Sequence, residues 1–141
     1  MIDADILGRA ALDRECGSIS DYMLRLFAFE VLLKAAVWLN GEVPANDHEY
    51  LGHWRRLPKP VGDEIQAAAR NRVAGPCGAR LDRLDDLLPT YSRLFTGGRY
   101  YYELNNATVW YYPEELYGLI HALEAHVRRM LPTVRADAVA P

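Results

Sequence analysis

Cysteine is scarce in this sequence. The 141 residues include only two, Cys16 and Cys77, which stand far apart and show no spacing typical of a metal site. Isolated cysteines of this kind are typical of reduced thiols in the cytosol, where disulfides are rare. We therefore expect both side chains to be free thiols.

An uninterrupted apolar run of membrane length is also lacking. A membrane-spanning helix needs about 20 apolar residues, and Glu30 and Lys34 interrupt the most hydrophobic stretch, residues 18–40. Asp3 and Asp5 stand where a signal peptide would carry basic residues, and no apolar segment follows them. These features predict a cytoplasmic protein that does not contact a membrane.

Positive charge is not in excess. The chain carries 16 Lys and Arg against 19 Asp and Glu, a net charge of −3. This balance argues against a generic polyanion binder, whose surface is usually strongly basic. A local basic surface stays open, although a solvated face is the simpler interpretation of its members, which are Arg55, Arg56, Lys59, Arg70, Arg72, Arg80 and Arg83.

The common catalytic and cofactor motifs are absent from the sequence. It has no Walker loop, nucleophile elbow, Cys-x-x-Cys pair or dinucleotide-binding fingerprint. His121 and His126 are five residues apart, so on a helix they diverge and do not make a metal site with Glu124. We expect no metal and no cofactor.

The sequence is rich in helical patterns. Its length suits one domain, and its content of 50% hydrophobic and 25% charged residues is that of an ordinary globular protein. Apolar periodicity and Gly or Pro boundaries predict helices over 3–15, 18–40, 47–57, 61–73, 80–95 (kinked or divided at Pro89) and 113–129. We predict an all-α fold, an antiparallel bundle of four to five helices over 1–132, and a flexible tail over 133–141.

The helix predicted over 18–40 organises the rest of the chain. One apolar stripe contains Tyr22, Leu26, Phe29, Leu33 and Val37, and a second stripe beside it contains Leu24, Phe27, Val31 and Trp38. Glu30 and Lys34, one turn apart, project into the seam between the stripes. One interpretation is an ion pair that either holds the packing register of the helix or lies at the edge of a subunit contact. The other is that Glu30 or Lys34 faces a polar site between helices.

His48 falls in the first turn of the helix predicted over 47–57, after a capping-box pattern of Asn46 and Glu49. The helix dipole disfavours a protonated imidazole at that position, so His48 is a candidate base near neutral pH. A surface or capping histidine is the alternative interpretation.

Aromatic residues gather near the end of the chain. Seven of the nine tyrosines lie between Tyr91 and Tyr117, and the segment 99–112 forms either a small β-hairpin or an ordered loop on the bundle. Aromatic rings stack on bases, and Arg99 directly follows two glycines, where backbone can approach a phosphate closely. The alternative is that the tyrosines cover helix ends or form an oligomer contact.

Three segments in order resemble the HEPN superfamily of small helical nucleic-acid-associated domains. Residues 29–35 contain a Glu-x-x-x-Lys pattern on a core helix, residues 48–58 run from His-Glu-Tyr to Leu-Pro, and residues 99–103 read Arg-Tyr-Tyr-Tyr-Glu just before the final helix. The similarity covers about residues 18–131. It implies an all-α bundle, a symmetric homodimer, and a groove used in RNA cleavage or in nucleotide-linked toxin–antitoxin and phage-defence systems.

The resemblance departs from the ribonuclease members of that superfamily at one place. They carry Arg-x(4–6)-His, whereas after Arg99 the corresponding positions hold Leu104, Asn105 and Asn106. Asn cannot act as a general base, so cleavage requires His48 or Glu103 to meet Arg99, with Arg99 stabilising the phosphate transition state. Whether the protein is an enzyme therefore stays open.

Three hypotheses follow. The first is a dimeric HEPN-like domain that binds RNA or a nucleotide, with Arg99, His48 and Glu103 as catalytic candidates and Glu30, Lys34, Tyr100, Tyr102 and Asn105 as ligand-binding candidates. The second is a non-catalytic protein-interaction module that partners a nucleotidyltransferase or another defence component. The third is a metal-independent ribonuclease with a variant site.

Overall fold

The described part of the chain, in a computed structural model, comprises residues 19–73, 75–97 and 113–139. It contains five α-helices, one 3-10 helix and no strand, which confirms the all-α fold predicted from the sequence. The elements are α2 (Ile19–Leu39), α3 (Tyr50–Arg55), α4 (Lys59–Arg72), η1 (Gly75–Asp82), α5 (Leu84–Gly97) and α6 (Pro113–Val139).

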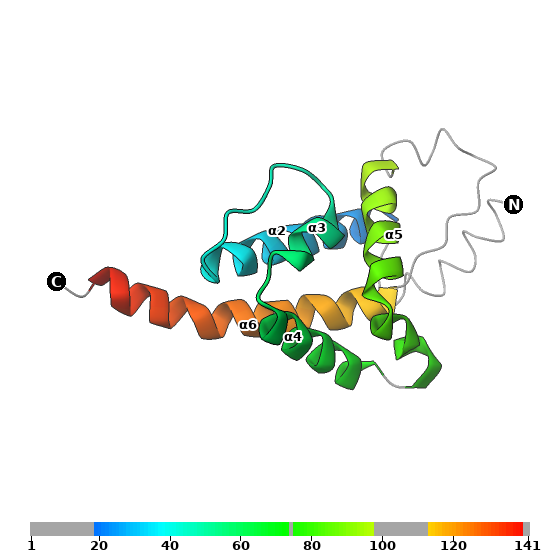
Figure 1. Cartoon of the computed structure of the whole chain (residues 1–141). Coiled ribbons are helices and arrows are strands. Elements are labelled where there is room, and N and C mark those ends of the chain that lie inside the picture. Colours follow the sequence, from blue (N-terminus) through cyan, green and yellow to red (C-terminus); the bar gives the residue numbers. More distant parts are fainter. Residues whose placement is uncertain (1–18, 74, 98–112, 140–141) are drawn as a thin grey trace, which may run out of the picture.

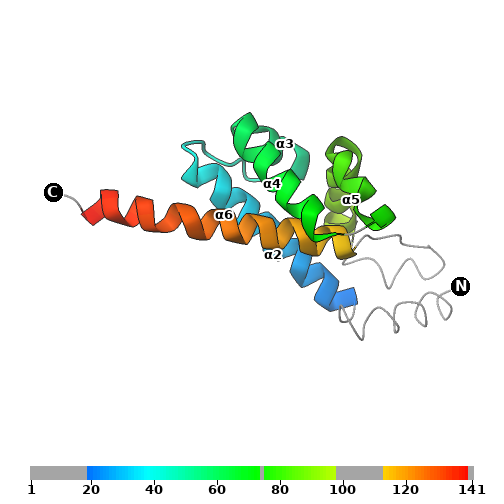
Figure 2. The same cartoon turned by 90° about the horizontal axis from the view of Figure 1, so that it is seen from below.

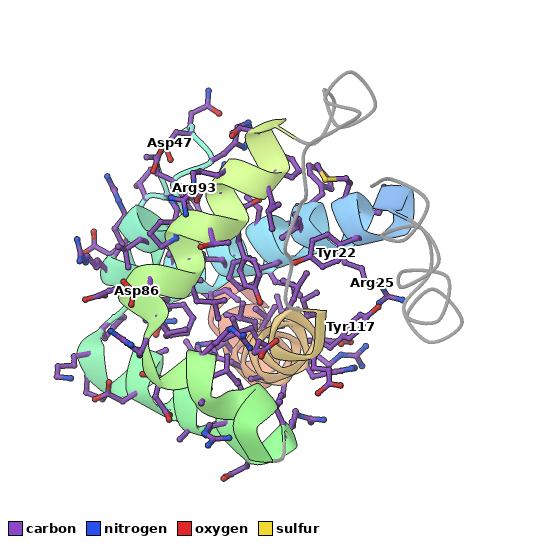
Figure 3. All side chains as sticks on the ribbon, turned by 90° about the vertical axis from the view of Figure 1, so that its right-hand side faces the viewer. Tyr22, Arg25, Asp47, Asp86, Arg93 and Tyr117 are labelled. Atoms are coloured by element: carbon purple, nitrogen blue, oxygen red, sulfur yellow. The ribbon has the colours of Figure 1, made fainter. Side chains whose placement is uncertain are left out.

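The two longest of these helices, α2 and α6, pack against each other in the middle of the bundle. They run in the same direction and cross at an angle, while α4 packs on α6 and runs in the opposite direction (Figures 1 and 2). The short helix α3 lies between α2 and α5, and α5 stands across the end of the bundle (Figure 1). Arg25 of α2 places its guanidinium 4.4 Å from the ring centroid of Tyr117 of α6, which ties the two long helices together (Figure 3).

One apolar core holds these helices together. The first predicted stripe of α2 is confirmed as its core face, since Tyr22, Leu26, Phe29, Leu33 and Val37 are all buried. The ring of Phe29 packs edge-on against Tyr50 of α3 at 5.3 Å and against Tyr91 of α5 at 6.0 Å. Leu116, Leu119 and Leu123 of α6 are fully buried in the same core.

The second predicted stripe of α2 does not pack in the core. Leu24, Phe27, Val31 and Trp38 are exposed by about half or more. At about 100° per residue these four positions lie on the side of the helix opposite to Leu33, not beside it. The prediction that the second stripe lies beside the first is therefore wrong.

Helix α3 is shorter than the helix predicted over 47–57 and begins at Tyr50. Glu49 occupies the N-cap position without a side-chain capping bond, so the Asn46–Glu49 capping box does not form. Instead the Asp47 carboxylate accepts a hydrogen bond from the Glu49 backbone N–H at 3.0 Å, a turn that Asp commonly stabilises. His48 consequently precedes the helix and does not lie in its first turn as predicted.

The later helices follow the predicted order with shifted ends. Helix α4 carries Pro60 in its first turn as predicted. The division predicted at Pro89 falls instead at Arg83, between η1 and α5, and Pro89 lies inside α5. Helix α6 begins at Pro113 as predicted and continues past Arg129 to Val139. The helix predicted over 3–15 and the hairpin or loop over 99–112 lie outside the described residues.

No helix in the described ranges is long and apolar enough to cross a membrane.

Candidate functional site

A buried carboxylate at the middle of α2 gathers polar side chains from two elements. Glu30 is only 4% exposed. Its Oε1 lies 2.6 Å from His48 Nδ1, and its Oε2 lies 3.4 Å from the ammonium of Lys34. We call Glu30, Lys34, His48 and Tyr50 the Glu30 cluster.

Tyr50 approaches the same carboxylate from the first residue of α3. Burial raises the pKa of the Tyr50 phenol well above its usual value, and the charge of Glu30 and a hydrogen bond to it raise the pKa further. The phenol therefore stays protonated and donates its hydrogen. The hydroxyl also lies 3.5 Å from the carbonyl oxygen of Leu26. Glu30 thus has several polar partners around it, as a buried polar side chain requires.

Local hydrogen bonds fix the loop that carries His48. Gly41 follows α2 with φ of 91°, a left-handed conformation that glycine adopts without strain. At the other end of the loop, the imidazole Nε2 of the buried His53 lies 3.0 Å from Asp47 Oδ1 and 3.1 Å from the Asp47 carbonyl oxygen. The backbone N–H of Tyr50 donates to Ser92 Oγ of α5 at 3.0 Å. The loop therefore reaches His48 with both of its ends anchored.

His48 is the accessible member of the cluster. Its side chain is 49% exposed, whereas that of Glu30 is 6% exposed. The imidazole packs on the ring of Phe95 with centroids 4.9 Å apart, and Phe95 in turn stacks on Phe27 of α2 at 6.3 Å. A carboxylate that engages Nδ1 fixes the ring and leaves Nε2 for a ligand or for proton transfer. The arrangement suits an imidazole that binds or protonates a group at the surface.

Three of the predicted site residues, Glu30, Lys34 and His48, therefore come together in the structure. The other predicted residues, Arg99, Tyr100, Tyr102, Glu103 and Asn105, lie outside the described residues. Tyr50 belongs to the cluster and Phe95 packs on its His48, although the sequence did not indicate either as a site residue. The only available signal was that Tyr50 follows His48 by two positions and that Phe95 belongs to an apolar helix face.

The basic residues that could have formed a nucleic-acid surface are mostly paired within the chain. The distances are 3.7 Å for Arg55–Asp85, 3.1 Å for Lys59–Asp63, 3.4 Å for Arg70–Asp82, 3.4 Å for Arg80–Glu115 and 3.3 Å for Arg83–Asp86, and Arg56 donates to the Val43 carbonyl at 2.7 Å. Paired cations contribute little net positive potential. In the described ranges this set behaves as the solvated face that the sequence allowed.

Two further buried polar groups lie on α6, away from the Glu30 cluster. Burial raises the pKa of Glu115, while Arg80, 3.4 Å away, acts in the opposite direction. His126 Nε2 lies 3.0 Å from Asn40 Nδ2, at the end of α2. Within the part of the chain that the structure describes, no three His, Cys, Asp or Glu residues are grouped so that they could hold a metal ion.

None of the protein-family models, curated proteins or solved structures compared with this chain matches it. The class that the fold and the site define is therefore a small all-α bundle with a carboxylate-held histidine at its surface. Its resemblance to HEPN domains depends on the three sequence segments alone.

Proposed function

We propose that the chain is a dimeric HEPN-like domain that binds RNA or a nucleotide at the Glu30 cluster, in a toxin–antitoxin or phage-defence system. The observation that carries the proposal is the half-exposed imidazole of His48, held at 2.6 Å by the buried Glu30 and packed on Phe95. Of the three HEPN-like segments, the structure brings parts of two together at this point.

The chemistry of the cluster suits a phosphate-containing ligand. The ammonium of Lys34 is a charged hydrogen-bond donor beside the imidazole of His48, and a charged donor to a phosphate makes a stronger hydrogen bond than a neutral one. Aromatic faces such as that of Phe95 stack on bases without sequence preference. Arg99 and Tyr102, which follow in the HEPN-like segment, would add a guanidinium and a further ring in this proposal.

Binding to labelled RNA and to nucleotides tests the proposal. Fluorescence anisotropy with single-stranded RNA and with a labelled adenine nucleotide should show binding by the wild-type protein. His48→Ala should weaken that binding about tenfold, the effect of losing roughly 1.4 kcal/mol. His121→Ala is the matched control, because His121 is an exposed histidine on α6 away from the cluster. Equal binding by His48→Ala and wild type, or no binding by wild type, would contradict the proposal.

The same samples distinguish binding from cleavage. Incubation of RNA without added metal, followed by electrophoresis, reports on the variant metal-independent ribonuclease. Cleavage by the wild type that is lost in both His48→Ala and Arg99→Ala, with both variants folded, would make the protein an enzyme. Intact RNA in all samples would leave a binding domain.

A non-catalytic protein-interaction module is the second candidate function. Both oxygens of Glu30 are occupied by groups of the same chain, which suits a cluster that pins the 41–49 loop to α2. A nucleotidyltransferase-type protein or another defence component would then be the partner. This candidate predicts that the wild-type protein binds neither RNA nor a nucleotide. It also predicts that His48→Ala lowers the free energy of unfolding.

A further inference from the structure

Helix α2 is apolar on two opposite sides, and the described parts of the chain bury only one of them. Leu26, Phe29 and Leu33 are fully buried in the core. The opposite side presents what we call the outer face of α2, formed by Leu24 at 67% exposure, Phe27 at 51%, Val31 at 49% and Trp38 at 63%. A helix that is apolar all round is normally buried all round. Four large side chains in one row are also more than the isolated apolar residues that any surface carries.

We propose that a second copy of this chain covers the outer face, with the two α2 helices packed antiparallel about a two-fold axis at Val31. In such a pair, residues whose numbers add up to 62 lie at the same level. Val31 then meets Val31, Leu24 lies level with Trp38, and Phe27 lies level with Ala35 of the other copy. A closed symmetric dimer requires this reciprocity, in which residue i meets j and j meets i.

The size of the side chains favours the antiparallel arrangement over a parallel one. In the antiparallel register the bulky Phe27 faces the small Ala35, and Trp38 faces Leu24 and not a second Trp38, which suits the interlocking of side chains in well-packed helix pairs. In a parallel pair each residue would meet its own copy, and both Phe27 and Trp38 would have to stack on themselves.

The charge of the outer face also suits a second copy. Its four residues are uncharged, and Lys34 at its edge is already matched by Glu30 of the same chain. Two copies therefore meet without like-charge repulsion, although the chain as a whole carries a charge of −3. A nucleic acid or an anionic membrane would find little unpaired positive charge on this face.

The area is adequate for a modest dimer. The four side chains expose apolar surface on the order of 400 Å² per copy. Together with Ala28, Lys34 and Ala35 around them, pairing would bury on the order of 1,000 Å² in total, which is the lower end for specific interfaces. We therefore expect a dimer that dissociates on dilution.

The inference concerns the homodimer within the proposed function and supplies its surface; it does not depend on RNA or nucleotide binding. Phe27 stacks on Phe95, which contacts His48, so the outer face borders the Glu30 cluster. A variant that loses ligand binding but stays dimeric tests the proposed function alone. A variant that becomes monomeric but still binds the ligand tests the dimer surface alone.

The oligomeric state of the full chain tests the surface. Sedimentation velocity at about 10 to 100 µM should give a dimer for wild type and a monomer for Val31→Glu, with the dissociation constant raised at least about tenfold. Val43→Glu is the matched control, because Val43 is 66% exposed and lies outside α2, and it should stay dimeric. Circular dichroism verifies that both variants are folded.

Two outcomes would overturn the proposal. A wild-type monomer over that range would mean that a second copy does not cover the face. A dimer that persists in Val31→Glu would mean that the protein is a homodimer whose contact lies on another surface.

Disulfide trapping tests the register, and it does not depend on the fold of Val31→Glu. In a background with Cys16 and Cys77 changed to Ser, Val31→Cys alone should form a covalent dimer under mild oxidation. Leu24→Cys alone should not, whereas the double variant with Trp38→Cys should. Cross-linking by Leu24→Cys alone would indicate a parallel pair, and absence of cross-linking by Val31→Cys would contradict the axis at Val31.

Discussion

Ser92 is a small side chain that connects two helices. It is 6% exposed, accepts the backbone N–H of Tyr50 at 3.0 Å and donates to the Leu88 carbonyl at 3.2 Å. Ser92→Ala would leave the first amide of α3 buried without an acceptor. We expect the free energy of unfolding to fall by about 1–3 kcal/mol, the cost of a buried unsatisfied donor. Urea denaturation followed by circular dichroism measures this change.

Thr96→Ala is the control for that measurement. Thr96 lies one turn further along α5, is exposed, and donates to the carbonyl oxygens of Ser92 at 2.9 Å and Arg93 at 3.4 Å within its own helix. Its removal should change the free energy of unfolding by no more than about 0.5 kcal/mol, as at other surface positions. Equal losses from the two variants would show that the Tyr50–Ser92 bond contributes nothing specific.

At the same scale, the candidate site was only partly predictable from the sequence. The spacing of Glu30 and Lys34 on one helix predicts their ion pair, and the pair is present at 3.4 Å. The contact of His48 with Glu30 joins a loop residue to a helix residue. Sequence periodicity could not predict this contact, because it does not determine where a loop packs on a helix. The resemblance placed His48 in the same site as Glu30, whereas the packing on Phe95 had no sequence signal.

At the scale of helices, Gly118 lies where α6 approaches α4 closely. A Cβ at this position would lie 2.9 Å from Val73 Cγ2 and 3.1 Å from the Ala69 carbonyl oxygen. Gly118→Ala should therefore destabilise the protein, because α6 must move away from the α4 backbone. This loss of stability should exceed the gain of up to about 1 kcal/mol that replacing glycine by alanine brings in a helix interior. Thermal unfolding should show a lower midpoint than wild type.

Gly97→Ala provides the comparison, since no atom lies within 4 Å of a Cβ built at Gly97 at the end of α5. We expect its midpoint to equal that of wild type within error or to be slightly higher. A midpoint for Gly118→Ala at or above that of Gly97→Ala would contradict the close approach of the two helices.

The two faces of α2 show what periodicity can and cannot predict for an element. Spacing correctly groups Tyr22, Leu26 and Phe29 on one face and Leu24 and Phe27 on another. It does not say whether a face is covered by the same chain or by a second molecule, because both environments favour apolar residues. The helix ends were predicted best where Pro or Gly fixes them, as at Pro113, and least well where tertiary packing decides, as at the start of α3.

For the whole molecule, His126 should make stability depend on pH. Burial lowers its pKa, the charge of Arg129 lowers it further, and Glu64 acts in the opposite direction. Its Nε2 lies 3.0 Å from the side-chain amide of Asn40, a contact in which the neutral ring accepts and a protonated one cannot. Below the unfolded-state pKa of about 6.5, the unfolded chain takes up a proton that the folded chain resists.

The free energy of unfolding should therefore decrease as the pH falls from 7.5 towards 5.5, with a slope of at most about 1.4 kcal/mol per pH unit from this one group. Urea titrations across that range measure the slope. In His126→Gln the side chain stays neutral, so the difference between the two profiles isolates His126 from Glu115, whose raised pKa acts with the opposite sign. Parallel profiles for the two proteins would refute the assignment.

The pairing of α2 with α6 has a consequence for the order in which the chain folds during synthesis. The first described helix packs against the last one, and three α-helices and a 3-10 helix lie between them in the sequence. While the ribosome is still translating α4 and α5, helix α2 lacks the helix against which it packs most extensively. Contacts between residues so far apart also close slowly. The nascent chain should therefore stay incompletely packed until α6 has left the exit tunnel, and fragments that end before Pro113 should not fold.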